Sequence, residues 1–240
     1  GQLPHRALRF ARCPRRGRGV LLPSDVFKLE GSAPIPFTME SLPNFRTRDV
    51  VTMWGTIDGE PFYFMVAHWP SRLGGKEASA PKRERAAEIM RHAADSVLAI
   101  NPATKVVMMG DFNDDATDKS ITEVLGAEGN IRKLQSGGYY NPFIDMLKAG
   151  IGSLAYRDQW NLFDNIVVSE NLATGSTGSL KLERAPRGNI TAIFSVPPIC
   201  SSRKASTRAT RCVRSWATIS RGDTATTFPY SFTSVNNPTK

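Results

Sequence analysis

Residues 105–115 read Lys-Val-Val-Met-Met-Gly-Asp-Phe-Asn-Asp-Asp, and this stretch decides the fold. Its first five residues are mostly apolar and predict a short buried strand over 105–109. Gly110 and several polar side chains follow at once, and among these Asp111 and Asn113 stand two residues apart. Because alternate residues of an extended chain face the same side, Asp111 and Asn113 can serve one site at the end of the strand.

A hairpin and a helix precede this strand in the sequence. The runs 50–57 and 61–68 are rich in β-branched and aromatic residues, and Asp58-Gly59 between them predicts an antiparallel hairpin. From 82 to 100 apolar residues recur at the spacing of one helical face, and Asn101-Pro102 ends the run. The hairpin and the helix are therefore the elements expected to pack around the buried strand.

Two shorter elements are expected after the strand. Thr117 or Asp118 can cap a helix that runs to Leu125 and stops at Gly126. Residues 166–168 form another short apolar run, which predicts a strand. Strands mixed with helices, including an antiparallel hairpin, predict an α/β fold with layers around a mixed sheet.

The net charge of +9 is unevenly spread along the chain. Residues 1–23 carry six Arg and no acid, and residues 184–240 carry nine Lys or Arg and a single acid. Residues 24–183 hold 16 basic and 21 acidic residues and are therefore acidic. The two ends also lack helical or strand periodicity, so taken alone they are typical of disordered basic segments. We therefore expect one domain over 24–188, with a basic end segment before it over 1–23 and a second one after it over 189–240.

Composition limits the class of protein. With 240 residues, of which 40% are hydrophobic, the chain can bury one substantial core. It has no apolar stretch long enough to span a membrane and no apolar signal region at its start, so we expect a soluble chain. Three Cys and three His match neither a disulfide framework nor a structural zinc pattern. The compartment stays open, because a signal peptide for a secreted or periplasmic protein would have preceded residue 1.

Asp111 and Asn113 are the first candidates for chemistry. A carboxylate beside an amide suits a hard cation, and no Cys or His stands nearby to favour zinc, so Mg²⁺ or Mn²⁺ is expected. The alternative is a loop in which both side chains only cap and turn the backbone. His68 closes the strand 61–68 and Arg72 follows in a Gly-rich loop, an arrangement typical of a general acid or a phosphate contact. His68 can equally be a structural residue of the strand end.

Three segments together resemble one family. They read Val-Ala-His68-Trp-Pro-Ser-Arg72, Gly110-Asp-Phe-Asn113-Asp and Trp160-Asn-Leu-Phe-Asp164-Asn-Ile-Val-Val-Ser169. In this order and spacing they are similar to the endonuclease/exonuclease/phosphatase superfamily with the pancreatic-deoxyribonuclease-like fold. The resemblance covers residues 24 to about 188. It implies a two-sheet α/β sandwich, present here in part, that hydrolyses phosphodiesters or phosphomonoesters with Mg²⁺.

The resemblance also implies a role for each motif residue. Asp111 is implied to orient or deprotonate the attacking water and, with Asn113, to bind the metal. Asn113 is also implied to hold the phosphate, and His68 to act as a phosphate contact or general acid. Asp164 matches the acid that orients a second histidine. Substrate contacts are expected from Arg72, Asn113 and Trp160.

Two elements of the family are missing from the 240 residues. The metal-binding Glu lies upstream of the matched segment in the family, and the terminal Ser-Asp-His with its histidine is not present. A one-base frame slip can explain the second loss, because residues 222–230 read one base back permit Gly-Gly-Tyr-Ser-Asp-His-Phe-Pro-Val. Residues 4–23 read one base forward likewise permit a strand-like string with acids. We therefore expect frame slips near Pro23/Ser24 and Gly188/Asn189.

The sequence thus predicts a phosphate-ester hydrolase, a nuclease, phosphodiesterase or phosphatase, that uses metal-assisted in-line attack of water. Because the missing residues act as a unit with those present, we expect this exact polypeptide to be weak or inactive. The alternatives are a non-catalytic pseudoenzyme, or a nucleic-acid-binding module that uses the Arg-rich ends. The substrate class stays open among nucleic acid, nucleotide and lipid head group, and we expect a monomer without a membrane span.

Overall fold

The computed structural model describes residues 26–156, 159–175 and 179–182, together with the backbone of five strands nearer the ends. These five strands are β1 (Leu8–Arg12), β2 (Gly19–Pro23), β13 (Thr210–Arg211), β14 (Ser215–Arg221) and β15 (Thr224–Tyr230). The remaining residues of the segments expected to be out of frame, and the side chains of both segments, lie outside the described residues.

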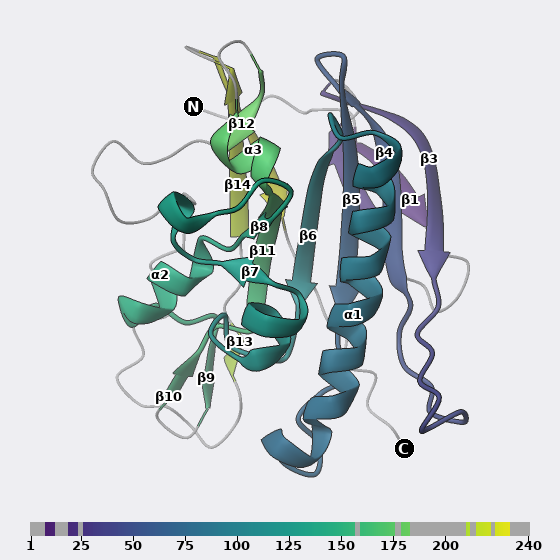
Figure 1. The fold of residues 1–240 in the computed structure, drawn as a ribbon, viewed down its shortest axis with the longest axis vertical. Coiled ribbons are helices and arrows are strands. Elements are labelled where there is room, and N and C mark those ends of the chain that lie inside the picture. Colours follow the sequence, from purple (N-terminus) through teal and green to yellow (C-terminus); the bar gives the residue numbers. More distant parts are fainter. Residues whose placement is uncertain are drawn as a thin grey trace.

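A seven-stranded mixed sheet forms the centre of the fold (Figure 1). Parallel pairing joins β5 to β6 and β7 to β8, and the other neighbours are antiparallel. The sequence-based expectation of an α/β fold with a mixed sheet is confirmed. In spatial order the strands are β3 (Phe27–Ile35), β4 (Val50–Ile57), β5 (Glu60–His68), β6 (Lys105–Asp111), β11 (Asp164–Ser169), β8 (Tyr139–Tyr140) and β7 (Ala127–Glu128).

Short elements complete the described fold. Two three-stranded sheets have the orders β10-β9-β13 and β12-β14-β15, and β1 pairs with β2. In the described part of the chain, no helix is both long and apolar enough to cross a membrane. The elements not yet named are α1 (Lys76–Ile100), the π-helical turn η1 (Ser120–Val124), the 3₁₀ turn η2 (Ile131–Lys133), α2 (Phe143–Lys148), β9 (Leu154–Tyr156), β10 (Gln159–Asn161), α3 (Glu170–Thr174) and β12 (Lys181–Leu182).

The predicted hairpin is formed by β4 and β5. Ile57 pairs with Glu60, which leaves a two-residue loop of Asp58 and Gly59. Both loop residues have positive φ, 49° and 80°, as the primed turns that join twisted strands require. Glycine takes such an angle without strain and aspartate tolerates it, so the Asp-Gly pair is the local reason for this hairpin.

The predicted helix begins earlier than its apolar periodicity indicated. It starts at Lys76 rather than at residue 82, with Pro81 inside its second turn. Proline interrupts most helix interiors, and for that reason the sequence placed the start after it. In the structure the backbone N–H and the hydroxyl of Ser79 both donate to the Gly75 carbonyl, so the first turn is closed ahead of Pro81.

The helix expected between residues 117 and 125 is a single π-helical turn, η1, so this prediction is wrong in type and length. Neither Thr117 nor Asp118 caps it, because Lys119 stands at its start and the side chain of Asp118 bonds elsewhere. The predicted stop is confirmed: Gly126 follows the turn with a φ of 72°.

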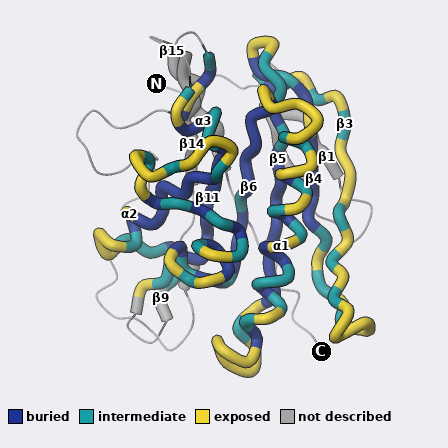
Figure 2. Tube along the Cα trace, viewed as in Figure 1, coloured by how far each residue is buried: buried dark blue, intermediate teal, exposed yellow. Residues whose placement is uncertain are grey.

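Helix α1 covers one face of the sheet (Figures 1 and 2). Ala87, Met90 and Ala94 of α1 are fully buried in one hydrophobic cluster with Met65 and Met108 of the sheet. Alternate residues of β5 and β6 point the other way, and they join a second cluster on the opposite face. Burial on both sides explains why β5, β6 and β11 read as nearly continuous apolar runs.

Gly110 allows β6 to lie close to β5 directly before the polar residues. Its φ is 142°, and a Cβ atom built on it would lie 1.8 Å from the carbonyl oxygen of Ala67. No side chain fits at this point without moving the backbone of β5.

We predict that Gly110→Ala destabilises the protein more than a glycine substitution without this contact. The matched control is Gly137→Ala, since Gly137 has a φ of 74° and open space around it. The control should cost about 1–2 kcal/mol through the positive φ alone. Gly110→Ala should cost about 1–3 kcal/mol more through overpacking against β5. Urea unfolding measures both, and equal losses for the two variants would contradict the prediction.

Candidate active site at the ends of three strands

Three neighbouring strands bring His68, Asp111 and Asp164 into one row. His68 ends β5 and is in register with Asp111 at the end of β6. Asp111 is in turn paired with Asp164, the first residue of β11. These three predicted site residues come from segments up to 96 positions apart, and backbone pairing alone makes them neighbours. The row lies at one edge of the sheet, where loops replace the strands.

His68 and Asp111 lie within ion-pair distance of each other. Nε2 of His68 is 3.4 Å from Oδ2 of Asp111, and the two side chains are only 9% and 4% exposed. An imidazole nitrogen and a carboxylate oxygen at this distance are both groups that can exchange protons with a ligand bound between the strand ends. Asp164 is also buried, and its backbone N–H donates to Oγ of Ser153.

Asn113 is tied to Asp111 and to the end of β5. Its backbone N–H donates to Oδ1 of Asp111 at 3.0 Å, and its side-chain nitrogen donates to the Trp69 carbonyl at 2.9 Å. These bonds occur with Asn113 at a φ of 53°, a left-handed conformation that few non-glycine residues adopt. Asp111 and Asn113 are therefore neighbours through a hydrogen bond and a left-handed residue, and not through the extended chain that their spacing suggested. That they serve one site stays a prediction.

The donor set of this edge suits a hard cation. Asp111 offers a carboxylate oxygen and Asn113 an amide oxygen, and Mg²⁺ is commonly held by one or two carboxylates while it keeps several waters. Among the residues that the structure describes, no group of three or more His, Cys, Asp or Glu is arranged as a complete metal cage. The residues present fit Mg²⁺ as a partial ligand set.

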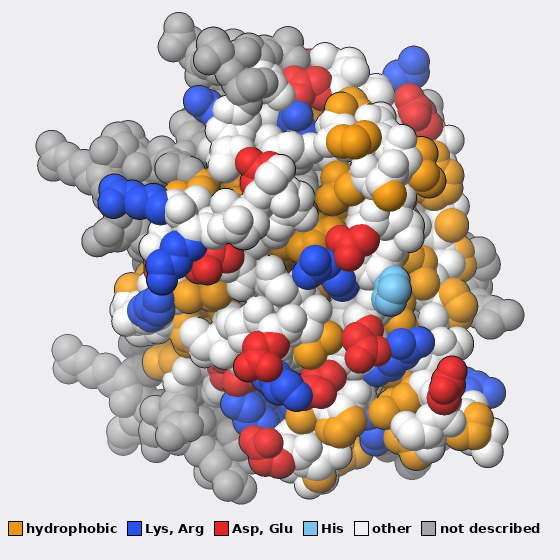
Figure 3. All heavy atoms as spheres, viewed as in Figure 1, with side chains coloured by type: hydrophobic (Ala, Val, Ile, Leu, Met, Phe, Trp, Pro, Cys, Tyr) orange, Lys and Arg blue, Asp and Glu red, His pale blue; other side chains and the backbone are white. Residues whose placement is uncertain are grey.

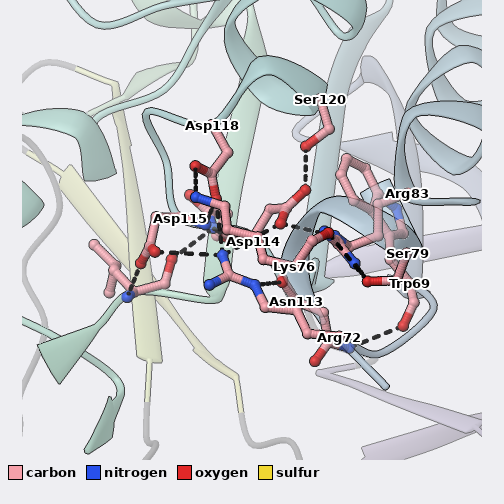
Figure 4. Close-up of polar contacts among 12 residues, drawn as sticks. Trp69, Arg72, Lys76, Ser79, Arg83, Asn113, Asp114, Asp115, Asp118 and Ser120 are labelled. Carbon is pink, nitrogen blue, oxygen red and sulfur yellow. Dashed lines mark hydrogen bonds and ion pairs between the residues drawn. The ribbon is translucent and has the colours of Figure 1, made fainter. Parts of the chain in front are cut away.

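An ionic network lies directly behind Asn113 (Figure 4). Arg72 donates from Nε to the Asn113 carbonyl at 2.8 Å, and its Nη2 lies 2.8 Å from Oδ2 of Asp118. The same Nη2 reaches Asp114 at 3.2 Å and Asp115 at 3.4 Å. The guanidinium was expected to contact a substrate phosphate, which stays a prediction, and in the structure it is surrounded by carboxylates of the protein.

Arg83 of α1 is a further member of this network. It is fully buried, and its Nε lies 2.7 Å from Oδ1 of Asp114. Burial raises the pKa of Asp114, whereas hydrogen bonds from Arg83 and Ser120 and the charge of Arg83 act to lower it. The charge of this carboxylate therefore depends on its buried partners.

Sequence reasoning missed Arg83, Asp114 and Asp118. A signal for Arg83 was present, because it stands three and four residues before the buried Ala86 and Ala87 and so lies on the buried face of the helix. A buried arginine requires a carboxylate partner, and the acid-rich run that follows β6 supplies one.

Trp160 was expected to contact the substrate. It precedes Asp164 in the chain and is 48% exposed, so its surface is open to a ligand, and its role remains a prediction.

On the face of the molecule shown in Figure 3, acidic and basic side chains are interspersed among apolar ones.

We predict that Arg83→Met unfolds the protein more easily, although methionine nearly matches the length of the side chain. Removing one partner of a buried ion pair costs about 3–5 kcal/mol. The control is Arg85→Met two positions along α1, whose partly exposed pair with Glu88 is worth about 0–1 kcal/mol. Chemical denaturation compares the two variants, and a loss at Arg83 no larger than the loss at Arg85 contradicts the structural role of the pair.

Comparison with known proteins gives the family and the fold of this chain. The sequence profile of the Endonuclease/Exonuclease/phosphatase family matches residues 9–195. A search of curated proteins gave no match. Among solved structures, truncated Caenorhabditis elegans TDP2 is 15% identical, with 75% of this chain and 66% of that chain covered and a TM-score of 0.49. A humanized D. rerio TDP2 is 16% identical, with 73% and 64% covered and a TM-score of 0.50.

A mannosyl-6-phosphatase from Bacteroides thetaiotaomicron is similar to the same degree, at 15% identity, 75% and 65% coverage and a TM-score of 0.47. This chain spans between 50% and 66% of the length of the three C. elegans TDP2 structures. Identities this low show a shared fold and nothing finer. The family profile, in contrast, matches most of the chain. The chain therefore belongs to the endonuclease/exonuclease/phosphatase family and has its deoxyribonuclease-I-like α/β fold.

Proposed function

We propose that this chain is a Mg²⁺-dependent phosphoric ester hydrolase whose site is the row of His68, Asp111 and Asp164 with Asn113 beside it. Family membership supports hydrolysis of phosphate esters. The observation that carries the assignment of residues is the strand register, which aligns His68 and Asp164 on the two sides of Asp111. This register joins three polar residues of three strands, and Asn113 in the loop after β6 is hydrogen-bonded to the middle one.

Asp111 is the residue best placed to act on water. Its Oδ1 accepts the Asn113 N–H, which fixes the orientation of the carboxylate that is proposed to accept a proton from an attacking water. The imidazole of His68, 3.4 Å from Oδ2 of Asp111, is proposed to contact the phosphate or to protonate the leaving group. The amide of Asn113 orients the phosphate. Mg²⁺ held by Asp111 and Asn113 would neutralise the charge that develops on the phosphoryl group.

Asp164 has a supporting role in this proposal. It is buried next to Asp111 in the sheet, and in the family the matching acid orients a second histidine. Residues 189–240 as given do not carry that histidine in its Ser-Asp-His context. Catalytic groups that act as a unit lose most of the rate when one member is removed. We therefore propose that this exact polypeptide is a weak hydrolase and that a frame slip accounts for its C-terminal segment.

The substrate is proposed only as a class. It is a phosphate ester, and nucleic acid, nucleotide and lipid head group all present the phosphoryl group that the site would recognise. Trp160 at the rim and Asn113 inside are proposed to contact it.

We predict slow turnover that requires Asp111 and Mg²⁺. The full chain is assayed with bis(p-nitrophenyl) phosphate and with p-nitrophenyl phosphate, which separate diester from monoester hydrolysis. Turnover should disappear with EDTA and fall about 100-fold or more in Asp111→Asn, because a general base contributes about that much. The control Asp145→Asn alters an exposed carboxylate on α2 and should leave the rate unchanged.

Two results would count against the proposal. Hydrolysis that persists in Asp111→Asn or in EDTA would place the chemistry elsewhere. Absence of turnover of both esters at high enzyme concentration would favour the pseudoenzyme alternative.

A further inference from the structure

The loop after β6 is held in a conformation that needs an explanation. Asn113 and Asp58 are the non-glycine residues with positive φ among those the structure describes. Asp58 belongs to a two-residue hairpin loop, where this angle is normal. Asn113 belongs to no hairpin, and residues held in sparsely populated regions persist only when their surroundings force them there.

Arg72 holds the backbone of Asn113 from the side opposite to its own hydrogen bonds to Asp111 and Trp69, because it binds the carbonyl group rather than the N–H or the side chain. Its Nε donates to the backbone carbonyl of Asn113 at 2.8 Å, which fixes the peptide directly after the left-handed residue. Its Nη2 lies 2.8 Å from Oδ2 of Asp118, and its guanidinium carbon lies 4.3 Å from the centre of the Phe163 ring. One planar group therefore contacts the loop after β6, the turn before η1 and the segment before β11.

The carboxylates around Arg72 are themselves held in place. Oδ2 of Asp118 also accepts the backbone N–H of Asp115, and Oδ1 of Asp115 accepts the backbone N–H of Leu162. Asp118 binds Lys76 at 2.6 Å as well. Nε and Nη2 of Arg72 thus donate to a fixed set of acceptors inside the protein.

We propose that Arg72 is a positioning residue that sets the conformation of Asn113, and through it the orientation of the Asp111 carboxylate. The second step follows because Asn113 N–H donates to Oδ1 of Asp111, so a change in the backbone of Asn113 moves that bond. This inference rests on the proposed function for its catalytic meaning. It differs from the expectation that Arg72 binds substrate phosphate, since a positioning residue acts through another residue.

The substitution Arg72→Lys distinguishes a phosphate contact from a positioning residue. A lysine at position 72 would keep a positive charge near an incoming phosphate, which is the property that a phosphate contact requires. It would lose the planar fork that reaches a carbonyl and a carboxylate at the same time. Arg72→Lys should therefore behave like the native protein if Arg72 binds phosphate, and like Arg72→Ala if it positions Asn113.

The first test reads the conformation of Asn113 directly and needs no activity. In the ¹⁵N-labelled full chain, the backbone and side-chain amide signals of Asn113 are identified by their loss in Asn113→Ala. We expect both signals to shift, and the side-chain amide to exchange faster with solvent, in Arg72→Ala and in Arg72→Lys. Arg132→Ala on η2, an exposed arginine, is the control and should leave them in place. Unchanged Asn113 signals in both Arg72 variants would overturn the proposal.

The second test uses the phosphodiester assay. Misplacing a catalytic group by about 1 Å costs about 100-fold in rate, so kcat should fall by about that factor in both Arg72 variants while KM stays the same. A raised KM with unchanged kcat, or full activity of Arg72→Lys, would make Arg72 a phosphate contact instead. If the native chain shows no turnover, the proposed function fails while the amide signals still decide whether Arg72 holds Asn113.

Should Arg72→Ala fail to fold, Arg72→Lys carries the same tests, because it keeps a positive charge among the carboxylates of Asp114, Asp115 and Asp118.

Discussion

The backbone pairing of β6 with β5 on one side and β11 on the other is the constraint on which the rest of the structure depends. It buries β6 between two neighbours and between two hydrophobic clusters, so its register has no freedom to slip. A shift by one residue would turn Met65 and Met108 away from α1 and exchange the two faces of the strands. The same register that satisfies the core places His68 and Asp164 on either side of Asp111.

Charge is the second constraint, and it acts where the sheet ends. Arg83 of α1 has no exposed surface. Asp114, in the loop after β6, lies within ion-pair distance of both Arg83 and Arg72. Charges in such surroundings are costly unless each is paired and hydrogen-bonded, so the network permits few arrangements. In the proposed mechanism this rigidity would fix the Asp111 carboxylate, because Arg72 binds the Asn113 carbonyl and the Asn113 N–H donates to Oδ1 of Asp111.

The candidate site could be predicted from sequence to the extent that its residues follow strands. His68, Asp111 and Asp164 stand at the ends of apolar runs, and strand ends point polar groups out of a core. The spacing of Arg83 from Ala86 and Ala87 indicated the buried face of α1, but nothing local identifies Asp114 as the partner of that arginine. The start of α1 was missed for a related reason: Pro81 reads as a helix breaker until Gly75 and Ser79 are seen to close the turn before it. Asp118, which the sequence offered as a cap for the helix near 117–125, uses its carboxylate to bind Arg72 and Lys76, which lie more than 40 residues away in the chain.

By itself, the sequence determined the hairpin of β4 and β5, the body of α1, and the strands β6 and β11, because periodicity and the Asp-Gly turn are local properties of the chain. It also determined the residue types of the site, because the motifs are contiguous. Only the tertiary structure decided which residues touch. The parallel pairing of β5 with β6 requires α1 to cross over the sheet, and the bonds of Arg72 join segments more than 40 residues apart. Contacts of this kind are selected by the burial and charge balance of the whole fold, which no single stretch of sequence contains.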